Sequence, residues 1–266
     1  MKLDNARVVL TGACGGIGRA LSEELLARGA RIGLVDRRAD DLEALRARHA
    51  AAADRIEAIA ADITDTAGRG RILARMQERF GGVDVLINNA GILAFTEFAR
   101  HDPAAIEQLV RVNVSAPLAL AQAVLPEMIA RGHGQIVNVG SMFGSIAFAW
   151  HAAYSASKYA LRGFSEALRR ELAGSGVGVT YVAPRAVRTP LNPPEVYRMA
   201  ERIRMKMDEP AKVARRIVDA IERDRKEVYL GFPESFFVRL NGLLPRLVDR
   251  ALQRQNDVMR GFLPQR

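Results

Sequence analysis

Three residues in the second half of the chain have the types and spacing of a proton-transfer site. Tyr154 and Lys158 are four positions apart, so on a helix they share one face, and Ser141 precedes the tyrosine by 13 positions. A phenol titrates near ~10 and is a poor base at neutral pH, but an ammonium group one turn away favours the phenolate. Ser141 can donate a hydrogen bond to a substrate oxygen. The set suits acid–base chemistry at a carbonyl or alcohol carbon.

A glycine-rich loop, Thr11–Gly18, follows a short apolar run near the start of the chain. Gly12 allows a tight turn, Gly16 lets the backbone approach a pyrophosphate, and Gly18 allows contact between helix and strand. The helix that begins here adds N–H donors and a positive dipole end. Asp36 ends the next apolar run, 24 residues after Gly12. Strand, glycine loop, helix, strand and acid in this order indicate a dinucleotide site.

The residues around Asp36 bear on which dinucleotide binds. A carboxylate at this position accepts hydrogen bonds from the adenosine ribose of NAD and repels the 2′-phosphate of NADP. Arg37 and Arg38 follow directly, and an arginine there could instead clamp that phosphate. We predict NAD, with NADP as the alternative. Lys158 can also bond the cofactor's ribose, and the oxidised nicotinamide would favour the phenolate further.

The elements that position these residues alternate along the chain. Apolar runs that predict strands are Arg7–Thr11, Arg31–Val35, Arg55–Ala60, Val83–Asn88, Gln135–Val139, Gly178–Ala183 and Glu227–Leu230. Between them, apolar residues recur at helical spacing, as in Ile17, Leu21 and Leu25. Strands that are apolar throughout and alternate with helices indicate a doubly wound (Rossmann) α/β fold. We expect one parallel sheet of about seven strands in a single domain over residues 1–266, followed by a helical C-terminal extension.

With these motifs placed, the chain resembles the short-chain dehydrogenase/reductase family of the Tyr-x-x-x-Lys type. The resemblance runs from about Arg7 to Leu230 and includes the family's T-G-x-x-x-G-x-G and N-N-A-G motifs. It implies an NAD(P)-dependent oxidoreductase that moves a hydride between the nicotinamide and a carbonyl or secondary alcohol, with Tyr154 as acid/base. The catalytic residues that it implies are Asn113, Ser141, Tyr154 and Lys158.

The resemblance also implies the cofactor site and the role of Asn113. By it, Asn113 holds a water that links Lys158 to solvent. The residues expected to contact the cofactor are Gly12, Cys14, Gly16, Ile17, Gly18, Asp36, Arg37, Asp62, Ile63, Asn89, Ala90, Gly91, Tyr154, Lys158, Pro184 and Thr189. Asp62 corresponds to the family's adenine contact and Thr189 to its nicotinamide amide contact.

Two positions depart from the family pattern. The family commonly has Pro-Gly where this chain has Pro184 and Arg185, so the loop either takes another path or Arg185 reaches the cofactor or an anionic substrate. Cys14 stands where serine is common, and we expect no nucleophilic role for it because nothing nearby in sequence would activate it. The neighbouring Ser155 and Ser157 are rival hydroxyl groups to Ser141.

Two late segments break the alternation and are expected to shape the substrate site. A proline-rich lid covers about residues 184–209, with Met199, Met205 and Met207 as an adaptable apolar surface. Phe148 and Trp150 are expected to wall the pocket. For His151, a pocket position and a chance placement stay open.

The extension, about residues 231–266, has apolar residues at helical spacing that Pro245 interrupts, which predicts two short helices or a kinked one. If Phe236, Leu240 and Leu243 close the site, the substrate is lipophilic. We prefer a terminal helix that packs over the substrate cleft or at a subunit interface. The alternative is a helix that lies on a membrane surface.

Composition and charge bound the remaining function classes. Apolar residues make up 49% and the net charge is +9, with most of the excess in residues 185–206 and 234–266. We see no aromatic-interleaved basic stripe, and the four histidines share no ligand spacing, so we expect neither nucleic-acid binding nor a metal. No apolar run looks long enough to cross a bilayer and no signal peptide is evident, which predicts a cytoplasmic protein. The family resemblance implies a homodimer or homotetramer. A catalytically idle cofactor-sensing protein is the alternative function.

Overall fold

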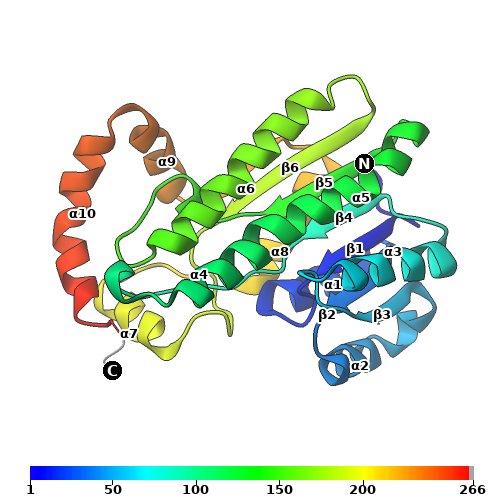
Figure 1. The fold of residues 1–266 in the computed structure, drawn as a ribbon, viewed down its shortest axis with the longest axis horizontal. Coiled ribbons are helices and arrows are strands. Elements are labelled where there is room, and N and C mark those ends of the chain that lie inside the picture. The colour runs from blue at the N-terminus through cyan, green and yellow to red at the C-terminus, as the bar shows by residue number, and fades with distance from the viewer. Residues whose placement is uncertain (264–266) are drawn as a thin grey trace.

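The computed structural model describes residues 1–263 of the chain. One parallel sheet runs through it in the order β3-β2-β1-β4-β5-β6-β7, with helices on both faces (Figure 1). The strands are β1 (Arg7–Thr11), β2 (Arg31–Asp36), β3 (Ile56–Ala60), β4 (Val85–Asn88), β5 (Gly134–Val139), β6 (Val177–Pro184) and β7 (Glu227–Leu230). The predicted doubly wound sheet is confirmed, and strand ends differ from the prediction by at most two residues.

Two sets of helices bury the two faces of the sheet. One face is covered by α1 (Gly16–Ala27), α2 (Ala39–Arg48) and α8 (Pro210–Glu222), and the other by α3 (Thr66–Phe80), α5 (Ala116–Arg131) and α6 (Ala152–Glu171). Shorter segments are α4 (Pro103–Val110), α7 (Pro194–Arg202), η1 (Ala50–Arg55), η2 (Phe98–Arg100), η3 (Arg111–Ser115) and η4 (Met142–Gly144). Because both faces are covered, the central strands are apolar on both sides: Val8, Val9 and Leu10 of β1 are all fully buried.

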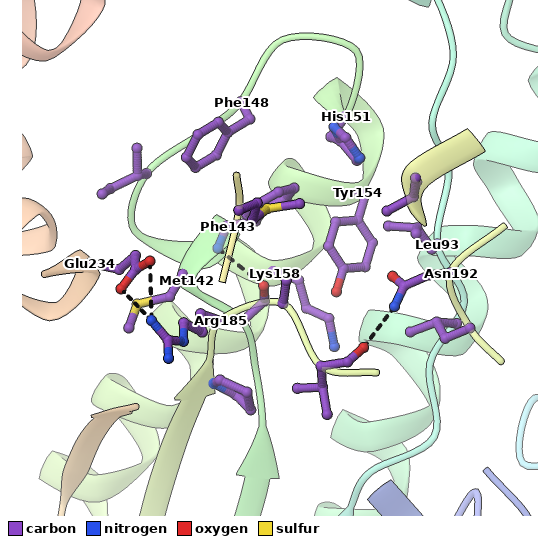
Figure 2. A pocket seen from close by; sticks show the side chains of 18 of the residues that line it. Leu93, Met142, Phe143, Phe148, His151, Tyr154, Lys158, Arg185, Asn192 and Glu234 are labelled. Atoms are coloured by element: carbon purple, nitrogen blue, oxygen red, sulfur yellow. Dashed lines mark hydrogen bonds and ion pairs between the residues drawn. The ribbon is translucent and has the colours of Figure 1, made fainter. Parts of the chain in front are cut away.

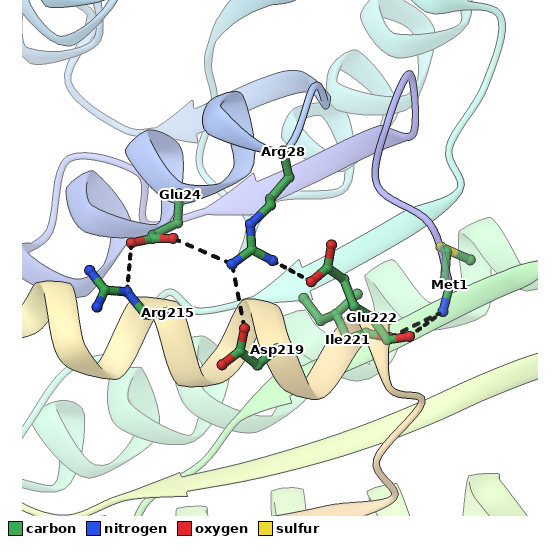
Figure 3. A network of polar contacts seen from close by, with 7 residues as sticks. All are labelled: Met1, Glu24, Arg28, Arg215, Asp219, Ile221 and Glu222. Atoms are coloured by element: carbon green, nitrogen blue, oxygen red, sulfur yellow. Dashed lines mark hydrogen bonds and ion pairs between the residues drawn. The ribbon is translucent and has the colours of Figure 1, made fainter.

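An ion-pair network ties α8 to α1 and to the N-terminus (Figure 3). The guanidinium of Arg28 lies 3.4 Å from the Asp219 carboxylate and also pairs with Glu222. The terminal ammonium of Met1 donates to the Glu222 carbonyl at 2.9 Å. Partly exposed pairs contribute little each, but together they fix the register of α8 against α1. The C-terminal end of α1, at the far end of the helix from the glycine loop, is thereby fixed to α8.

The lid and the C-terminal extension lie at the carboxyl edge of the sheet. The lid contains α7, and the extension forms α9 (Glu234–Leu243) and α10 (Pro245–Arg260). Pro245 occupies the first turn of α10, so the predicted break in the helical pattern is confirmed there. Met259 near the end of α10 packs against Met199 of α7, which brings the extension over the lid (Figure 1).

The expectation that no segment is long enough to cross a bilayer is wrong by length and composition. The continuous helix Pro103–Arg131, made of α4, η3 and α5, has a mean hydropathy of 1.3 over its most apolar window. It packs against β4 and β5, however, and Leu120 and Val124 lie in the core. A helix that packs in the core of a globular fold can have the same length and hydropathy as a membrane span. The helix also supplies Asn113 to the site described next.

Candidate active site

The glycine loop is held in place by the segment that follows β4. Gly12 has a left-handed φ of +65°, and a Cβ there would come within 2.8 Å of the Ala90 Cα. The Asn89 side chain donates to the carbonyls of Thr11 and Gly12 at 3.0 and 3.1 Å. The Thr11 hydroxyl accepts from the backbone N–H groups of Asn89 and Ala90. The N-N-A-G motif therefore braces the turn, which accounts for its occurrence with the glycine loop.

The start of the lid lies against the N-terminus of α1. A Cβ at Gly16 would meet the Thr189 side chain at 2.5 Å, so only glycine lets these two segments touch. Gly18 is as tightly placed, since its Cβ would come within 2.1 Å of the Gly12 carbonyl oxygen. Ile17, Thr189 and Pro184 line one cavity. The glycine loop and the lid therefore meet at one site.

The end of β2 places Asp36 beside the glycine loop. Its carboxylate accepts from the Cys14 backbone N–H at 3.1 Å and from that of Arg37 at 2.8 Å. Arg37 is exposed, and its charge reaches Asp62. Burial alone would raise the pKa of Asp62, but hydrogen bonds from Thr64 and the charge of Arg37 lower it below its usual range. The Asp36 carboxylate is thus engaged by the backbone of Cys14 and Arg37, whereas the Arg37 charge acts on Asp62.

Two further residues expected at the cofactor are buried. Burial, assisted by the charge of Asp36, raises the pKa of the Cys14 thiol to about 11, so the reactive thiolate is scarce at neutral pH. This agrees with the absence of a nucleophilic role predicted for Cys14. Ile63 lies in the core on the α3 side of the sheet.

The proposed acid–base residues meet at the end of β5 and on α6. Tyr154 and Lys158 are buried on one face of α6, and both point into the same part of a cavity (Figure 2). The Ser141 side chain lies on the Tyr154 side of the cavity, where it acts to lower the pKa of the phenol, and it accepts from the Phe143 backbone N–H at 3.1 Å. Lys158 Nζ donates to the Val139 carbonyl at 3.2 Å. Spacing predicted that Tyr154 and Lys158 share a helix face, and the structure adds Ser141 to the same cavity wall.

The electrostatics of this group differ from the sequence expectation. Burial raises the pKa of Tyr154 to about 12, and Ser141 lowers it only in part. Burial also lowers the pKa of Lys158 to about 8, so its ammonium form still predominates at pH 7 but is lost at lower pH than in a free lysine. In the protein alone, desolvation dominates the pKa of Tyr154. Tyr154 is therefore a neutral phenol at neutral pH, and its role as acid/base stays a prediction.

Asn113 lies in the π-helical turn η3 and not in a regular α-helix. Its side chain accepts from the Ile92 N–H and donates to the Ile92 carbonyl, both at 2.9 Å. It also donates to the Ser157 hydroxyl at 3.1 Å. A Cβ at Gly91 would lie 3.3 Å from the Asn113 Oδ1 and 3.6 Å from the Lys158 Nζ. Asn113 is thus near Lys158, and its water-mediated role stays a prediction.

The rival hydroxyl groups face away from this chemistry. Ser157 donates to the Tyr154 carbonyl at 2.7 Å and accepts from Asn113, which fixes its hydroxyl inside the helix packing. The Ser155 hydroxyl is buried and has no hydrogen-bond partner within residues 1–263. Ser141 is the serine whose side chain acts on the pKa of Tyr154.

The cavity at this site has a volume of about 480 Å³ and a mainly apolar wall. Its apolar lining includes Met142, Phe143, Phe148, Met199, Met205 and Met259. His151 also lines it: the ring stacks on Phe95 at 4.9 Å, and burial lowers its pKa to about 4, so it is neutral. Trp150, expected in the wall, instead packs with the end of the extension under Arg260.

Arg185 lines the cavity, and its guanidinium is engaged by carboxylates of the protein, so a contact with the cofactor or an anionic substrate stays a prediction. Its guanidinium forms two 2.9 Å hydrogen bonds with Asp208 at the end of the lid and one of 3.1 Å with Glu234 at the start of α9. Its charge is thereby compensated within the protein (Figure 2). Asp208 and Glu234 were missed from the sequence, where the one signal was an arginine at the family's usual glycine.

The extension closes the cavity, but not with the residues that helical spacing indicated. Phe236 and Leu243 are 57% and 79% exposed, and Leu240 packs against the core under η4. The cavity is lined instead by Pro233 and Phe237, together with Glu234, Gln255 and Met259. The expectation of closure by Phe236, Leu240 and Leu243 is wrong because α9 turns its neighbouring face to the site.

Comparisons with known proteins agree with this geometry. The family model described as short chain dehydrogenase matches residues 6–198. "Dehydrogenase/reductase SDR family member 7B" of Bos taurus is 33% identical over 261 residues, covering 93% of this chain and 80% of that protein. "2-(R)-hydroxypropyl-CoM dehydrogenase" of Xanthobacter autotrophicus is 35% identical, covering 69% and 75%. A short chain dehydrogenase from Burkholderia cenocepacia, solved with NADP, superposes with a TM-score of 0.80 at 26% identity, covering 95% and 99%.

Proposed function

Since the chain belongs to the short-chain dehydrogenase/reductase family and is an oxidoreductase, we propose that it interconverts a lipophilic ketone or aldehyde and its alcohol with NAD(P). One observation carries the proposal. Tyr154, Ser141 and Lys158 line the same cavity, whose wall is otherwise largely apolar. The relative that acts on 2-(R)-hydroxypropyl-CoM is consistent with alcohol chemistry on this fold.

The side chains divide the work between binding and proton transfer. In reduction, the carbonyl oxygen of the substrate accepts hydrogen bonds from the Tyr154 and Ser141 hydroxyls, and Tyr154 gives up its proton as the alcohol forms. When bound, the nicotinamide supplies the hydride in this direction and takes it in the other. Lys158, with a pKa of about 8, holds a proton near Tyr154 that can stabilise the phenolate left behind.

The backbone around the glycine loop fits a dinucleotide. Added Cβ atoms at Gly12, Gly16 and Gly18 would all collide with neighbouring atoms, so the loop is a close-fitting cradle of backbone. Gly15 caps α1 with no side-chain hydrogen bond, and the first turn contains no acidic residue. The first N–H groups of α1 are thus suited to a pyrophosphate. Asn89 and Lys158 lie in the wall of the cavity that this loop borders.

We propose NAD over NADP. The Asp36 carboxylate is held beside the loop by two backbone N–H groups, where a 2′-phosphate would meet a like charge. Repulsion between the Asp36 carboxylate and the 2′-phosphate costs on the order of a few kcal/mol before salt screening. This corresponds to an affinity for NAD roughly tenfold to a thousandfold higher than for NADP. Arg37, exposed and near Asp62, can offset part of this repulsion.

The cofactor assignment is tested by kcat/KM with each cofactor for the native enzyme, Asp36→Ala and Arg37→Ala. Asp36→Ala should narrow or invert the preference for NAD. Arg38, paired with Asp41 at 2.6 Å, supplies the matched control Arg38→Ala, which should leave the preference unchanged. A native preference for NADP that Arg37→Ala abolishes would show that Arg37 reads the cofactor.

The reaction itself is tested with a panel of ketones and alcohols of increasing chain length. Tyr154→Phe should lower kcat by roughly 10²-fold or more and change cofactor affinity little. Tyr159→Phe is the matched control, because Tyr159 is on the same helix and partly exposed. Near-normal turnover in Tyr154→Phe would refute the acid/base role. Tight cofactor binding with no turnover of any substrate would favour an idle cofactor-binding protein.

A further inference from the structure

The link after β7, α9 and the start of α10 expose more large apolar side chains than any other described segment of comparable length. The most exposed are Phe232, Phe236, Leu243, Leu244 and Leu247, each with more than half of its surface accessible. Phe236 and Leu243 are seven positions apart and therefore share one face of α9. Leu244 and Leu247 continue this surface around the turn into α10. We call residues 232–247 the apolar hairpin.

Positive charge accompanies the apolar hairpin. Arg239, Arg246 and Arg250 are exposed and form no ion pair within residues 1–263. Of the acids in this part of the chain, Glu234 is engaged by Arg185, and Asp249 remains. Exposed leucine and phenylalanine next to uncompensated arginine is the composition of a helix that binds an anionic lipid surface.

The apolar hairpin is continuous with the wall of the substrate cavity. Phe237 lines the cavity and is still 42% exposed, while its neighbour Phe236 faces outward and contacts it at 5.9 Å between ring centroids. Pro233, next to the exposed Phe232, lines the cavity as well. An apolar molecule could therefore pass from the outer face of α9 to the cavity along phenylalanine side chains.

We propose that the apolar hairpin docks on an anionic membrane surface and that the enzyme draws its lipophilic substrate from the bilayer; this rests on the function proposed above. A second copy of the chain fits the same face less well. A two-fold contact would bring the same arginines of both copies together, and Asp249 is the one acid of residues 232–250 that Arg185 does not engage. Lipid headgroups supply the missing negative charge.

The test measures binding of the full-length protein to vesicles by co-sedimentation. Vesicles of phosphatidylcholine alone are compared with vesicles containing one quarter phosphatidylglycerol. The native protein should bind the anionic vesicles, and added salt should weaken that binding. The double variant Leu243→Ser/Leu244→Ser should reduce the partition coefficient roughly tenfold or more. Arg246→Gln/Arg250→Gln should also reduce it roughly tenfold, but only on anionic vesicles.

Matched controls come from another exposed apolar surface. Val110→Ser/Ile129→Ser removes two partly exposed side chains of α4 and α5 and should leave vesicle binding unchanged. Equal loss in this control, or no vesicle binding by the native protein, would overturn the proposal. A native oligomer that Leu243→Ser/Leu244→Ser converts to a smaller species, without vesicle binding, would assign the surface to a second copy.

Turnover separates this proposal from the function on which it rests. A small water-soluble ketone should be reduced equally by the native protein and by Leu243→Ser/Leu244→Ser, because neither leucine lines the cavity. A long-chain ketone presented in anionic vesicles should be reduced more slowly by the variant. Equal rates on the vesicle-borne ketone would refute substrate delivery from the membrane, whereas failure with every ketone would refute the proposed function.

Discussion

Replacing Lys158 with methionine would measure how much stability the active site gives up to keep an ammonium group buried. Lys158 is buried, and within the described residues its Nζ donates to the Val139 carbonyl at 3.2 Å. Burial lowers its pKa from 10.5 to about 8. Since one pH unit corresponds to ~1.4 kcal/mol, holding the proton in the folded protein costs roughly 3 kcal/mol relative to the unfolded chain.

The pH dependence of this cost has a definite sign. Between about pH 8 and 10.5 the unfolded chain binds more protons than the folded protein, so stability of the native protein rises with pH. The full cost is present below about pH 8. Methionine has similar length and no charge, and it leaves the Val139 carbonyl unpaired at ~1 kcal/mol. Lys158→Met should therefore raise the free energy of unfolding by ~2 kcal/mol at pH 7, and the gain should vanish near pH 10, where the remaining cost of the ammonium equals that of the unpaired carbonyl.

Urea unfolding at pH 7 and pH 10, followed by the fluorescence of the single tryptophan, Trp150, measures both free energies. Lys212→Met is the matched control, because Lys212 is exposed on α8 and should change stability by less than ~0.5 kcal/mol. A Lys158→Met protein no more stable than the native one at pH 7 would refute the reasoning. So would a gain of the same size at both pH values. Turnover should be lost in this variant whatever its stability.

Three further predictions concern two groups that line the cavity and the buried cysteine of the glycine loop. Arg185→Ala leaves the largely buried Asp208 carboxylate unpaired and should lower the free energy of unfolding by ~3 kcal/mol. The double variant Arg185→Ala/Asp208→Ala should recover part of this loss. A loss under ~1 kcal/mol in thermal unfolding of Arg185→Ala would contradict the prediction. Cys14, with a pKa of about 11, should react with iodoacetamide at pH 8 roughly 100-fold more slowly than a free thiol, and the rate should climb until about pH 11. Labelling at the speed of free cysteine would show an exposed thiolate. His151, with a pKa of about 4, stays neutral above pH 5, so His151→Phe should keep the shape of the kcat/KM profile from pH 5 to 9. Disappearance of a titration near pH 6 to 7 in that variant would mean that His151 ionises in the native enzyme.

The sequence alone determined the features that depend on local chemistry. A strand that is buried on both faces must be apolar throughout, so β1 and β5 were found to within one residue. Gly12 was identified because the turn leaves no room for a Cβ, and the structure shows this; Gly18 was identified for a helix–strand contact, whereas its Cβ would meet the glycine loop itself at Gly12 and Ala13. The four-residue spacing of Tyr154 and Lys158 places them on one helix face in any fold.

Only the tertiary structure decided the energetics of the site and the partners of its charged groups. The pKa of Tyr154 depends on how completely the surrounding segments exclude water, and no residue type or spacing reports that. Arg185 binds carboxylates 23 and 49 positions away, which come near it only once the lid and α9 fold over the edge of the sheet. Whether Phe236 or Phe237 faces the cavity depends on the rotation of α9 about its axis. Helical periodicity fixes which residues share a face, but packing against the rest of the fold fixes which face is buried.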